Sequence, residues 1–457
     1  MDARFSFSDA AGAPASCTFR FPGHSAAQHT RPAMNLRFLI AVLTAMQFTH
    51  LVDFVIMMPL GPRLMRDLSC TPSEFSSLVA AYTIASGVAA ALAGSVLDRF
   101  GRKTALLTCF GGMTLATAAC GWSNTYEALL FARIAAGACG GLVGALTFAI
   151  IGERVPWEKR GRASGVVMSA FSLASIIGIP IGMGLAEVGR WQTPFLVLAT
   201  LGVVVWFIAA VTLPTMAEHR TGPARSLLRT VHTVFAEAAH RHAFVLTISL
   251  TFAGFTVIPL LATYLVTNAG VAELHVGWFY GLGGLVTVVT GPWIGRLADR
   301  FGKRRVFIIV ATLSLIPILV CTHLPRVGEG LALAAGVLFI TLVSGRFVPA
   351  MAMITQAARP DVRGAFQAYH TAVQSLASGA AVLIAGWLVT TGANGELQGY
   401  GTVGWIAAVA TVIAIAASFS LATPAPSDLP PRPPDAPGPD AAVALIPASG
   451  GEPAIRS

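Results

Sequence analysis

Three charged side chains stand inside long apolar stretches of this sequence: Asp53, Arg133 and Arg346. In hydrocarbon such a charge costs about 2.5–3.5 kcal/mol, so each one needs a chemical reason to be there. A carboxylic acid in this setting can take up and release a proton, and a guanidinium can pair with a carboxylate or contact a polar solute. These residues are therefore the first candidates for function.

Asp53 and Arg133 can reach one another if their stretches are helices that cross a membrane in opposite directions. Asp53 lies about 17 residues into its stretch and Arg133 about seven into its own, which at about 1.5 Å per residue places them at similar depth. Two interpretations stay open, a pair that couples a proton to movement and a purely structural ion pair. For Arg346, contact with a solute and hydrogen bonding to neighbouring carbonyls are equally open.

Two polar stripes run along apolar stretches. At about 100° per helical residue, the four side chains of the later stripe fall within about 80° of one another, and the earlier stripe covers a face about 120° wide. The members are Gln367, His370, Gln374 and Ser378 in the later stripe, and Gln47, His50 and Asp53 in the earlier one. Such faces line an aqueous cavity or hydrogen-bond to a neighbouring helix. We expect a substrate cavity, and assign to it Gln47, His50, Arg346, Gln367, His370 and Gln374.

The composition explains why so few polar residues stand out. Of 457 residues, 55% are hydrophobic and 11% are charged, whereas a soluble protein carries about 25% charged residues. Lipid must therefore surround most of the chain. The six cysteines form no CxxC pair or His/Cys cluster, so we expect no metal or other cofactor. Because the nucleotide-binding loop and hydrolase motifs such as GxSxG are also lacking, we do not expect an enzyme.

Twelve segments are long and apolar enough to cross a bilayer core about 30 Å thick as helices. They are 36–59, 73–97, 104–122, 126–150, 161–186, 193–213, 242–266, 274–297, 305–322, 330–356, 362–391 and 399–421. They do not alternate as the strands of a membrane barrel do, so the predicted fold is an all-α polytopic membrane protein. Residues 1–33 are predicted to be a disordered extension. We expect either that translation starts at Met34 or that these residues form a loose tail. Residues 424–457 read as a Pro-rich disordered tail.

The basic residues give the orientation of these segments. Of the 30 lysines and arginines, 24 fall on the side that holds both chain ends, four on the other side and two within segments. Because positively charged loops stay in the cytoplasm, both termini are predicted to be cytoplasmic. The net charge of +9 follows from this rule, and no nucleic-acid partner is expected.

The longest loop, 214–241, separates the first six segments from the last six. Apolar residues recur in it at helical spacing, which indicates an amphipathic helix on the inner membrane face, with a partner-binding helix as the alternative. We therefore expect two six-helix bundles, 34–213 and 242–423, joined by this loop.

A charged knot occurs twice, as GSVLDRFGRK at 94–103 and as GRLADRFGKR at 295–304. Each knot follows the second segment of its half, and Asp98 matches Asp299 at an offset of 201 residues. The chain is thus predicted to be a duplicated six-helix unit. Parallel repeats of this kind, with a binding site between them near the midplane, are typical of secondary transporters.

The knots resemble the signature of the major facilitator superfamily, G-x-x-x-D-[RK]-x-G-[RK]-[RK], in both of its expected places. Within that superfamily, residues 34–423 resemble the bacterial drug- and sugar-efflux antiporters with twelve spans. This narrower match rests on FVIMMPLGPRLMRDL, LLFARIAAGACGG and SGRFVPAMAMITQAARPDVRGAF. The antiporter motif of the fifth span is present in degenerate form, as Gly178, Pro180, Gly182 and Gly184.

The resemblance implies that the knots are conformational latches. In this family the aspartate of one knot is held against the start of the eleventh span, here near Arg363, and the other knot docks on the fifth span, near Arg160. An acid at the end of the fourth span holds an arginine of the knot, here Glu153 beside Arg102. The expected latch residues are Gly94, Asp98, Arg99, Gly101, Arg102, Glu153, Arg160, Asp299, Arg300, Gly302 and Arg363.

We therefore interpret the sequence as a secondary active transporter of the bacterial inner membrane, a proton-coupled exporter of a small drug-like or sugar-like solute. Asp53 and Arg133 are the predicted proton-coupling pair. The expected partners are the solute, protons and the lipid bilayer, and the expected state is a monomer. Two alternatives stay open, an uptake or facilitated carrier of the same fold and, from a different class, a polytopic membrane enzyme or receptor.

Overall fold

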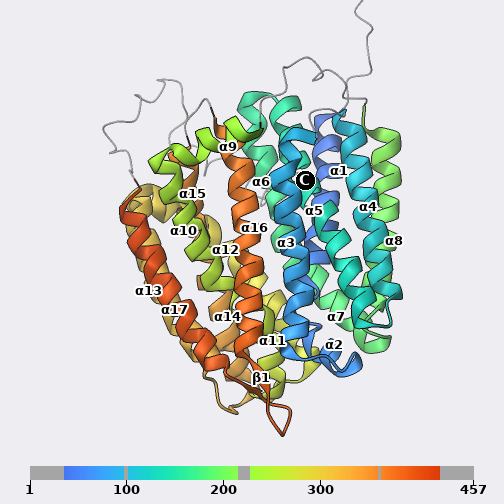
Figure 1. Cartoon of the computed structure of the whole chain (residues 1–457), viewed down its shortest axis with the longest axis vertical. Helices are drawn as coiled ribbons and strands as arrows, with labels where there is room; N and C mark the ends of the chain where they lie inside the picture. Colours follow the sequence, from blue (N-terminus) through green and yellow to red (C-terminus); the bar gives the residue numbers. More distant parts are fainter. Residues whose placement is uncertain (1–34, 97–100, 215–226, 359–361, 422–457) are drawn as a thin grey trace, which may run out of the picture.

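The computed structural model describes residues 35–96, 101–214, 227–358 and 362–421. In these ranges, twelve helical spans are long and apolar enough to cross a membrane. The predicted fold class is confirmed, because long helices lie side by side through the whole molecule and two short strands lie at one end (Figure 1). The predicted disordered regions, 1–33 and 424–457, lie outside the described residues.

Helices α1 to α8 make up the first half of the chain, and α10 to α17 make up the second half. The first half contains α1 (Leu36–Val55), α2 (Gly61–Asp67), α3 (Pro72–Val96), α4 (Arg102–Trp122), α5 (Tyr126–Arg154), α6 (Trp157–Leu173), a π-helical turn (Ala174–Gly178), α7 (Ile179–Val188) and α8 (Thr193–Thr212). Between the halves lies α9 (Leu227–Ala236). The second half contains α10 (Ala238–Phe255), α11 (Ile258–Thr267), α12 (Glu273–Phe301), α13 (Lys303–Thr322), α14 (Glu329–Gly345), α15 (Phe347–Ala357), α16 (Arg363–Leu388) and α17 (Tyr400–Phe419).

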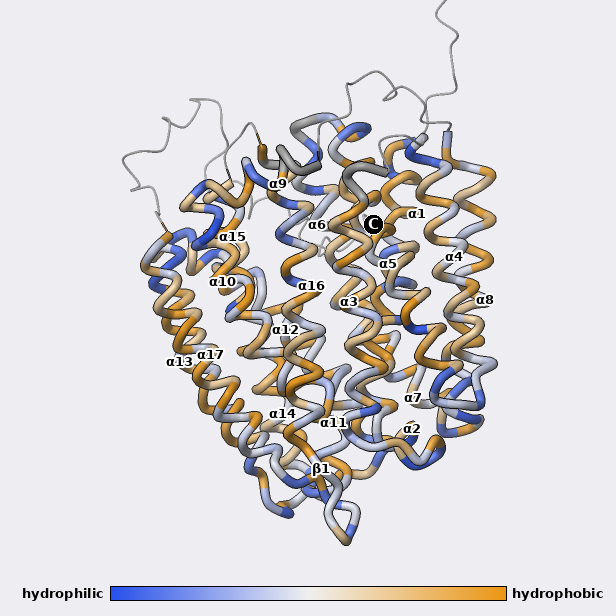
Figure 2. The backbone as a smooth tube through the Cα atoms, in the orientation of Figure 1, coloured by the Kyte–Doolittle hydropathy of each residue, from blue (hydrophilic) through white to orange (hydrophobic). Residues whose placement is uncertain are grey.

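The surface along the spans is apolar. Figure 2 shows hydrophobic residues along the length of the helices and hydrophilic residues gathered toward the two ends of the molecule. Large side chains such as Phe131, Val289 and Trp387 are mostly exposed. Such a surface suits hydrocarbon, in which each helix satisfies its own backbone hydrogen bonds.

Two spans are interrupted at equivalent places. A few residues separate α1 from α2, and α10 from α11. Pro59 and Pro259 account for both breaks, because a proline lacks the N–H that would bond to the carbonyl four residues earlier, here that of Val55 and Phe255. Val55 and Phe255 are the last residues of α1 and α10. The duplication that is visible in the charged knots therefore extends to the backbone geometry.

The two halves meet along two sets of helices. α3 packs against α16, and α12 packs against α7 and the π-helical turn. Glycine allows the first contact to be close, because a Cβ atom on Gly87 would lie 2.9 Å from the Leu376 side chain and 3.1 Å from the carbonyl of Ala372. A larger residue at this position would push α3 and α16 apart.

The two ends of the molecule carry different elements. At one end α9 lies against α10 and α16, with the ring of Phe235 stacked on that of Phe244 at 4.8 Å (Figure 1). The helix expected within 214–241 is thus present, and it packs on the second half. At the other end β1 (Thr390–Thr391) and β2 (Leu397–Gln398) form an antiparallel hairpin. We refer to these as the α9 end and the hairpin end.

Candidate functional site

Asp53 and Arg133 form an ion pair in the interior of the first half. Arg133 Nη1 lies 3.3 Å from Asp53 Oδ2 and donates to the backbone carbonyl of Asp53 at 3.1 Å. Thr117 on α4 donates to Asp53 Oδ1 at 3.0 Å. Both charged side chains are completely buried, so neither meets bulk water unless the surrounding helices move. The structure brings together the two residues that the sequence analysis assigned to proton coupling.

Tyr82 on α3 extends this pair. The Arg133 guanidinium lies over the Tyr82 ring, 4.4 Å from its centroid, which is an arrangement that stabilises a cation. The Tyr82 hydroxyl is hydrogen-bonded to Nδ1 of His50 at 3.0 Å. Asp53, Thr117, Arg133, Tyr82 and His50 therefore form one continuous set of contacts, which we call the buried polar network.

Two members of this network, Tyr82 and Thr117, were missed by the sequence analysis. A tyrosine in a span made mostly of small apolar residues was an available signal for Tyr82. Thr117 gave no such signal, because a threonine in a helix commonly bonds to the preceding turn, and Thr117 also donates to the carbonyl of Met113 at 2.9 Å. Its second bond, to Asp53, depends on how α1 and α4 pack.

Glycines of α5 make room for the network. A Cβ atom on Gly137 would lie 2.7 Å from Cα of Tyr82. A Cβ atom on Gly140 would lie 2.6 Å from the Tyr82 hydroxyl and 2.9 Å from His50 Nδ1. All three distances are shorter than a carbon atom tolerates, so only glycine allows α5 to approach α3 closely enough for Arg133 to lie over Tyr82.

Phe54 connects the network to the second half. Its ring stacks on that of Tyr82 with centroids 5.4 Å apart, and it meets the ring of Phe255 at 6.2 Å. Phe54 lies on α1 and Phe255 ends α10, so this contact crosses the interface between the halves. One aromatic side chain thus connects Tyr82 to the second half.

Arg346 lies inside the second half, between α14 and α15. Its Nη1 donates to Ser314 Oγ on α13 at 3.1 Å and to Thr411 Oγ1 on α17 at 2.9 Å. The side chain is completely buried. The partners are thus hydroxyls of neighbouring helices, in place of the carbonyls that were considered from the sequence.

The other cavity candidates are spread over both halves. Gln47 and His370 are almost fully buried, Gln374 is half-buried and Gln367 is exposed. Within the described ranges, neither Gln47 Oε1 nor either ring nitrogen of His370 has a hydrogen-bond partner. Buried polar atoms are usually paired, so these positions are suited to a polar ligand or water. The described residues offer no group of three His, Cys, Asp or Glu side chains that could hold a metal ion.

An ionic cluster joins the two halves at the hairpin end. Arg66 on α2 donates to both carboxylate oxygens of Glu273 on α12, at 2.7 and 3.2 Å. The Nε atom of Arg63 lies 3.6 Å from the same carboxylate, and Arg63 also donates to the backbone carbonyl of Ala186 on α7. The hydrogen bond to Glu273 raises the pKa of Arg66, so this arginine stays charged. The cluster holds α2, α7 and α12 together.

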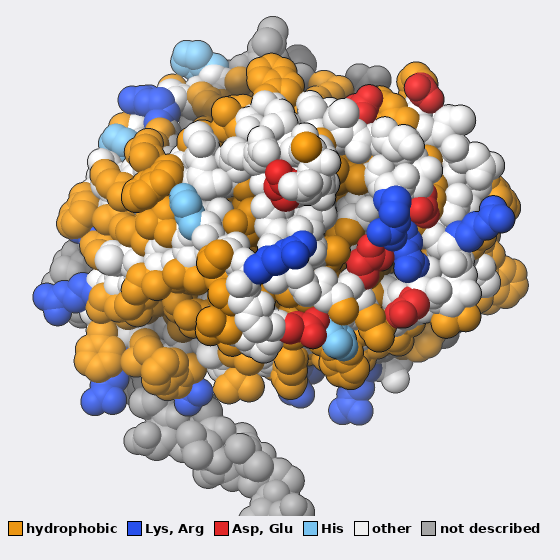
Figure 3. All heavy atoms as spheres, turned by 90° about the horizontal axis from the view of Figure 1, so that it is seen from below, with side chains coloured by type: hydrophobic (Ala, Val, Ile, Leu, Met, Phe, Trp, Pro, Cys, Tyr) orange, Lys and Arg blue, Asp and Glu red, His pale blue; other side chains and the backbone are white. Residues whose placement is uncertain are grey.

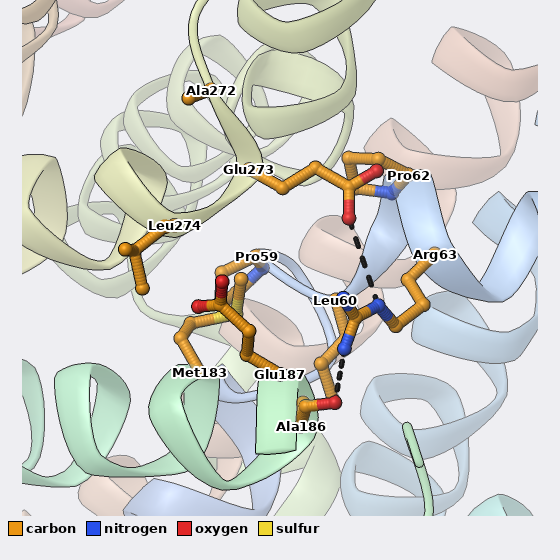
Figure 4. Close-up of a pocket in the computed structure, with 10 residues that line it drawn as sticks. All are labelled: Pro59, Leu60, Pro62, Arg63, Met183, Ala186, Glu187, Ala272, Glu273 and Leu274. Carbon is orange, nitrogen blue, oxygen red and sulfur yellow. Dashed lines mark hydrogen bonds and ion pairs between the residues drawn. The ribbon is translucent and has the colours of Figure 1, made fainter. Parts of the chain in front are cut away.

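A cavity of about 240 Å³ lies beside this cluster. Figure 4 shows Arg63 between Glu273 and the carbonyl of Ala186, with Glu187 also lining the cavity. Seen from the hairpin end, charged side chains of both signs gather near the middle of the molecule and hydrophobic ones surround them (Figure 3). The contact between the halves at this end is therefore ionic at its surface.

Each charged knot is tied to the last helix of its own half. Lys103 bonds to the carbonyl of Leu213, just beyond α8, and its repeat equivalent Arg304 bonds to the carbonyl of Leu421, just beyond α17. In the first half, Arg102 Nε also donates to Glu153 Oε1 at 3.0 Å. The structure thus places Arg102 against the acid at the end of α5.

The remaining latch candidates are described only in part. Asp98 and Arg99 lie outside the described residues, as do the surroundings of Gly94 and the side chain of Arg363. Gly101 directly precedes α4, Arg160 donates to the carbonyl of Val155 at 2.9 Å, and Asp299 and Arg300 are exposed near the end of α12. Gly302 follows with a φ of +95°, a left-handed conformation that favours glycine.

The family of this chain follows from comparison with known proteins. The sequence profile described as Major Facilitator Superfamily matches residues 43–255 and 243–449. The chain belongs to the major facilitator superfamily. Members of this superfamily are transporters, and the similar proteins found are transporters rather than enzymes, so this superfamily member is a membrane transporter and not an enzyme.

The two relatives described next are bacterial proteins. The MFS-type transporter YwfA of Bacillus subtilis (strain 168) is 26% identical over 383 residues, which cover 82% of this chain and 90% of YwfA. The multidrug resistance protein MdtG of Proteus mirabilis (strain HI4320) is 26% identical over 336 residues, which cover 71% of this chain and 82% of MdtG. The crystal structure of a D-xylose–proton symporter aligns with a TM-score of 0.69 at 16% identity, covering 83% of this chain and 97% of the symporter, which shows a shared fold.

Proposed function

We propose that this transporter is a proton-coupled exporter of a small drug-like or sugar-like solute in the plasma membrane of a bacterial cell. The Asp53–Arg133 pair carries the proposal, because it places a protonatable carboxylate beside a fixed cation in the interior of a transporter. The relatives support the setting, since they are bacterial and one of them is named a multidrug resistance protein.

Protonation of Asp53 removes the charge that holds Arg133. In the ionised state the carboxylate accepts hydrogen bonds from both Arg133 and Thr117. Once Asp53 is neutral, the guanidinium keeps its hydrogen bond to the backbone carbonyl of Asp53 and its contact with the ring of Tyr82. We infer that Arg133 then moves relative to α1, and that the proton is the event that starts this movement.

The contacts of Tyr82 carry this movement outward. Its hydroxyl is bonded to His50, which is one of the residues assigned to the substrate cavity. Its ring is stacked on Phe54, which touches Phe255 in the second half. The protonation state of the pair is thereby linked both to the cavity and to the interface between the halves.

The two ends of the molecule supply opposing closures for alternating access. We propose that the α9 end is cytoplasmic, that the Arg66–Glu273 cluster closes the opposite end, and that the knots close the cytoplasmic end in the alternate state. The bundles 34–213 and 242–423 would then rock about the interface between the two halves. A proton would enter from the hairpin end and leave to the cytoplasm while the solute travels the other way.

The test is transport by the purified protein in liposomes, with solutes chosen by a screen in a pump-deficient strain. The wild type should move protons when a transported solute is added. Asp53→Asn should insert and bind the solute but should not couple its export to a pH gradient. Glu127→Gln, which changes an exposed carboxylate at the start of α5, is the matched control and should transport normally.

Three results would contradict the proposal in different ways. Gradient-driven export by well-expressed Asp53→Asn would exclude Asp53 as the proton carrier. A severe loss of folded protein in this variant would indicate a structural pair, since stranding one buried charge costs about 3–5 kcal/mol. Movement of solute and proton in the same direction would identify an uptake carrier of the same fold.

A further inference from the structure

The charges buried in the two halves do not balance. Among the described residues, the Asp, Glu, Lys and Arg side chains that are completely buried are Asp53, Arg133 and Arg346. The first two neutralise each other at 3.3 Å. No described carboxylate pairs with Arg346, whose hydrogen-bond partners are the Ser314 and Thr411 hydroxyls. The buried charges of the second half therefore sum to +1, whereas those of the first half sum to zero.

Neutral hydroxyls do not remove this charge. Both contacts of Arg346 are made by Nη1, while Nε and Nη2 have no hydrogen-bond partner within the described part of the chain. A guanidinium stays protonated in proteins, so the charge is not lost by titration. An uncompensated ion in a low-dielectric interior costs several kcal/mol. The uncompensated charge therefore calls for a negatively charged group, and the two nitrogens have no other acceptor among the described residues.

Gly254 on α10 lies beside this guanidinium. A Cβ atom added to Gly254 would lie 3.9 Å from Arg346 Nη2 and 3.6 Å from the side chain of Val343, so the unpartnered nitrogen faces this glycine at ordinary contact distance.

We propose that Arg346 and Gly254 form a binding site for a small monovalent inorganic anion such as chloride. The anion accepts hydrogen bonds from Nε and Nη2 and neutralises the second half as Asp53 neutralises the first. The residues that surround the guanidinium come from α10, α13, α14 and α17, and its complete burial suits a single small ion rather than a drug-like solute. The site is separate from the Asp53–Arg133 pair.

Thermal unfolding of the purified transporter tests the site without any transport measurement. Buffers of equal ionic strength would contain chloride or gluconate, an anion too large to enter. A thiol-reactive dye reports unfolding, because Cys120 and Cys321 are buried free cysteines. Chloride should raise the unfolding midpoint by a few degrees and should saturate, as expected for a ligand that binds only the folded state, and bromide should do the same. Equal midpoints throughout the chloride titration would overturn the proposal.

Variants identify the site. Gly254→Asp supplies an internal carboxylate, so it should be stable in gluconate and should show no further response to chloride. Gly254→Asn has the same size without the charge and should unfold at a lower temperature than Gly254→Asp in gluconate; equal midpoints for the two would overturn the proposal. A chloride response that persists in Arg346→Gln would place the anion elsewhere and would also overturn it. If Arg346→Gln does not fold, the Gly254 pair and the wild-type titration still decide.

Discussion

Phe54 and Phe255 touch across the interface between the two halves, with their ring centroids 6.2 Å apart. Phe54 lies just before the break between α1 and α2, and Phe255 lies at the matching break between α10 and α11. The contact therefore joins corresponding parts of the two halves. Because Phe54 also stacks on Tyr82, the buried polar network reaches the interface between the halves.

Replacing Phe54 with alanine should weaken the coupling between proton and solute. The substitution removes the link between Tyr82 and Phe255, and aromatic pairs contribute about 0.5–1.5 kcal/mol beyond the area that they bury. We expect a several-fold increase in proton leak through liposomes that contain no solute, and Phe255→Ala should have the same effect. Phe131→Ala, which changes an exposed aromatic residue, should show no leak. Tight coupling in both interface variants would argue against this pathway.

Removing only the Tyr82 hydroxyl should slow transport while leaving the fold intact. Tyr82→Phe keeps the ring beneath Arg133 but loses the hydrogen bond to His50, which is worth about 0.5–1.5 kcal/mol. We expect normal amounts of protein and a several-fold lower rate of proton-coupled transport. Tyr82→Leu also loses the contact with the guanidinium and should lower the amount of folded protein. Wild-type rates in Tyr82→Phe would show that the hydroxyl has no part in coupling.

Neutralising Glu273 should favour opening at the hairpin end. Glu273→Gln removes the carboxylate that Arg66 and Arg63 share, and an exposed ion pair of this kind contributes up to about 1 kcal/mol, or about fivefold in an equilibrium. A single cysteine can be introduced beside the cavity at the hairpin end. The rate at which a thiol reagent added on that side labels it should rise by a similar factor. Glu273→Asp keeps the negative charge and should be labelled more slowly than Glu273→Gln. Unchanged labelling in Glu273→Gln would mean that the cluster does not limit opening.

The two knots should differ in importance. In the first half the knot is held by the Arg102–Glu153 pair. The second half has Gln356 at the position that matches Glu153 at an offset of 203, and a glutamine cannot pair in charge with Lys303. Asp98→Asn should therefore impair transport more than Asp299→Asn at equal expression. The opposite ranking would show that the acid at the end of the fourth span does not set the strength of the latch.

Local features of the sequence were sufficient to predict the twelve spans and the pairing of Asp53 with Arg133. Hydrophobic length predicted the twelve spans, and depth along two helices brought Asp53 and Arg133 to the same level, because rise per residue is a property of one helix. Tyr82, Thr117 and Phe255 could not be assigned in this way, since their roles depend on which face of α3, α4 or α10 meets α1. The same limit applies to Glu273, whose partners lie about 200 residues earlier in the chain. Such contacts are fixed by packing between helices rather than by periodicity.

The position of α9 has a consequence for how this protein can be handled genetically. Since Phe235 of α9 stacks on Phe244 and meets Tyr369, the helix is attached to the second half. A gene divided between the codons for Pro214 and Leu227 would therefore leave α9 with the fragment on which it folds. Two co-expressed polypeptides cut there are expected to reassemble, so that isotope labels or fluorophores can be confined to one fragment. Cutting after Ala236 instead would detach α9 from α10 and α16, and we expect that pair of fragments to assemble poorly.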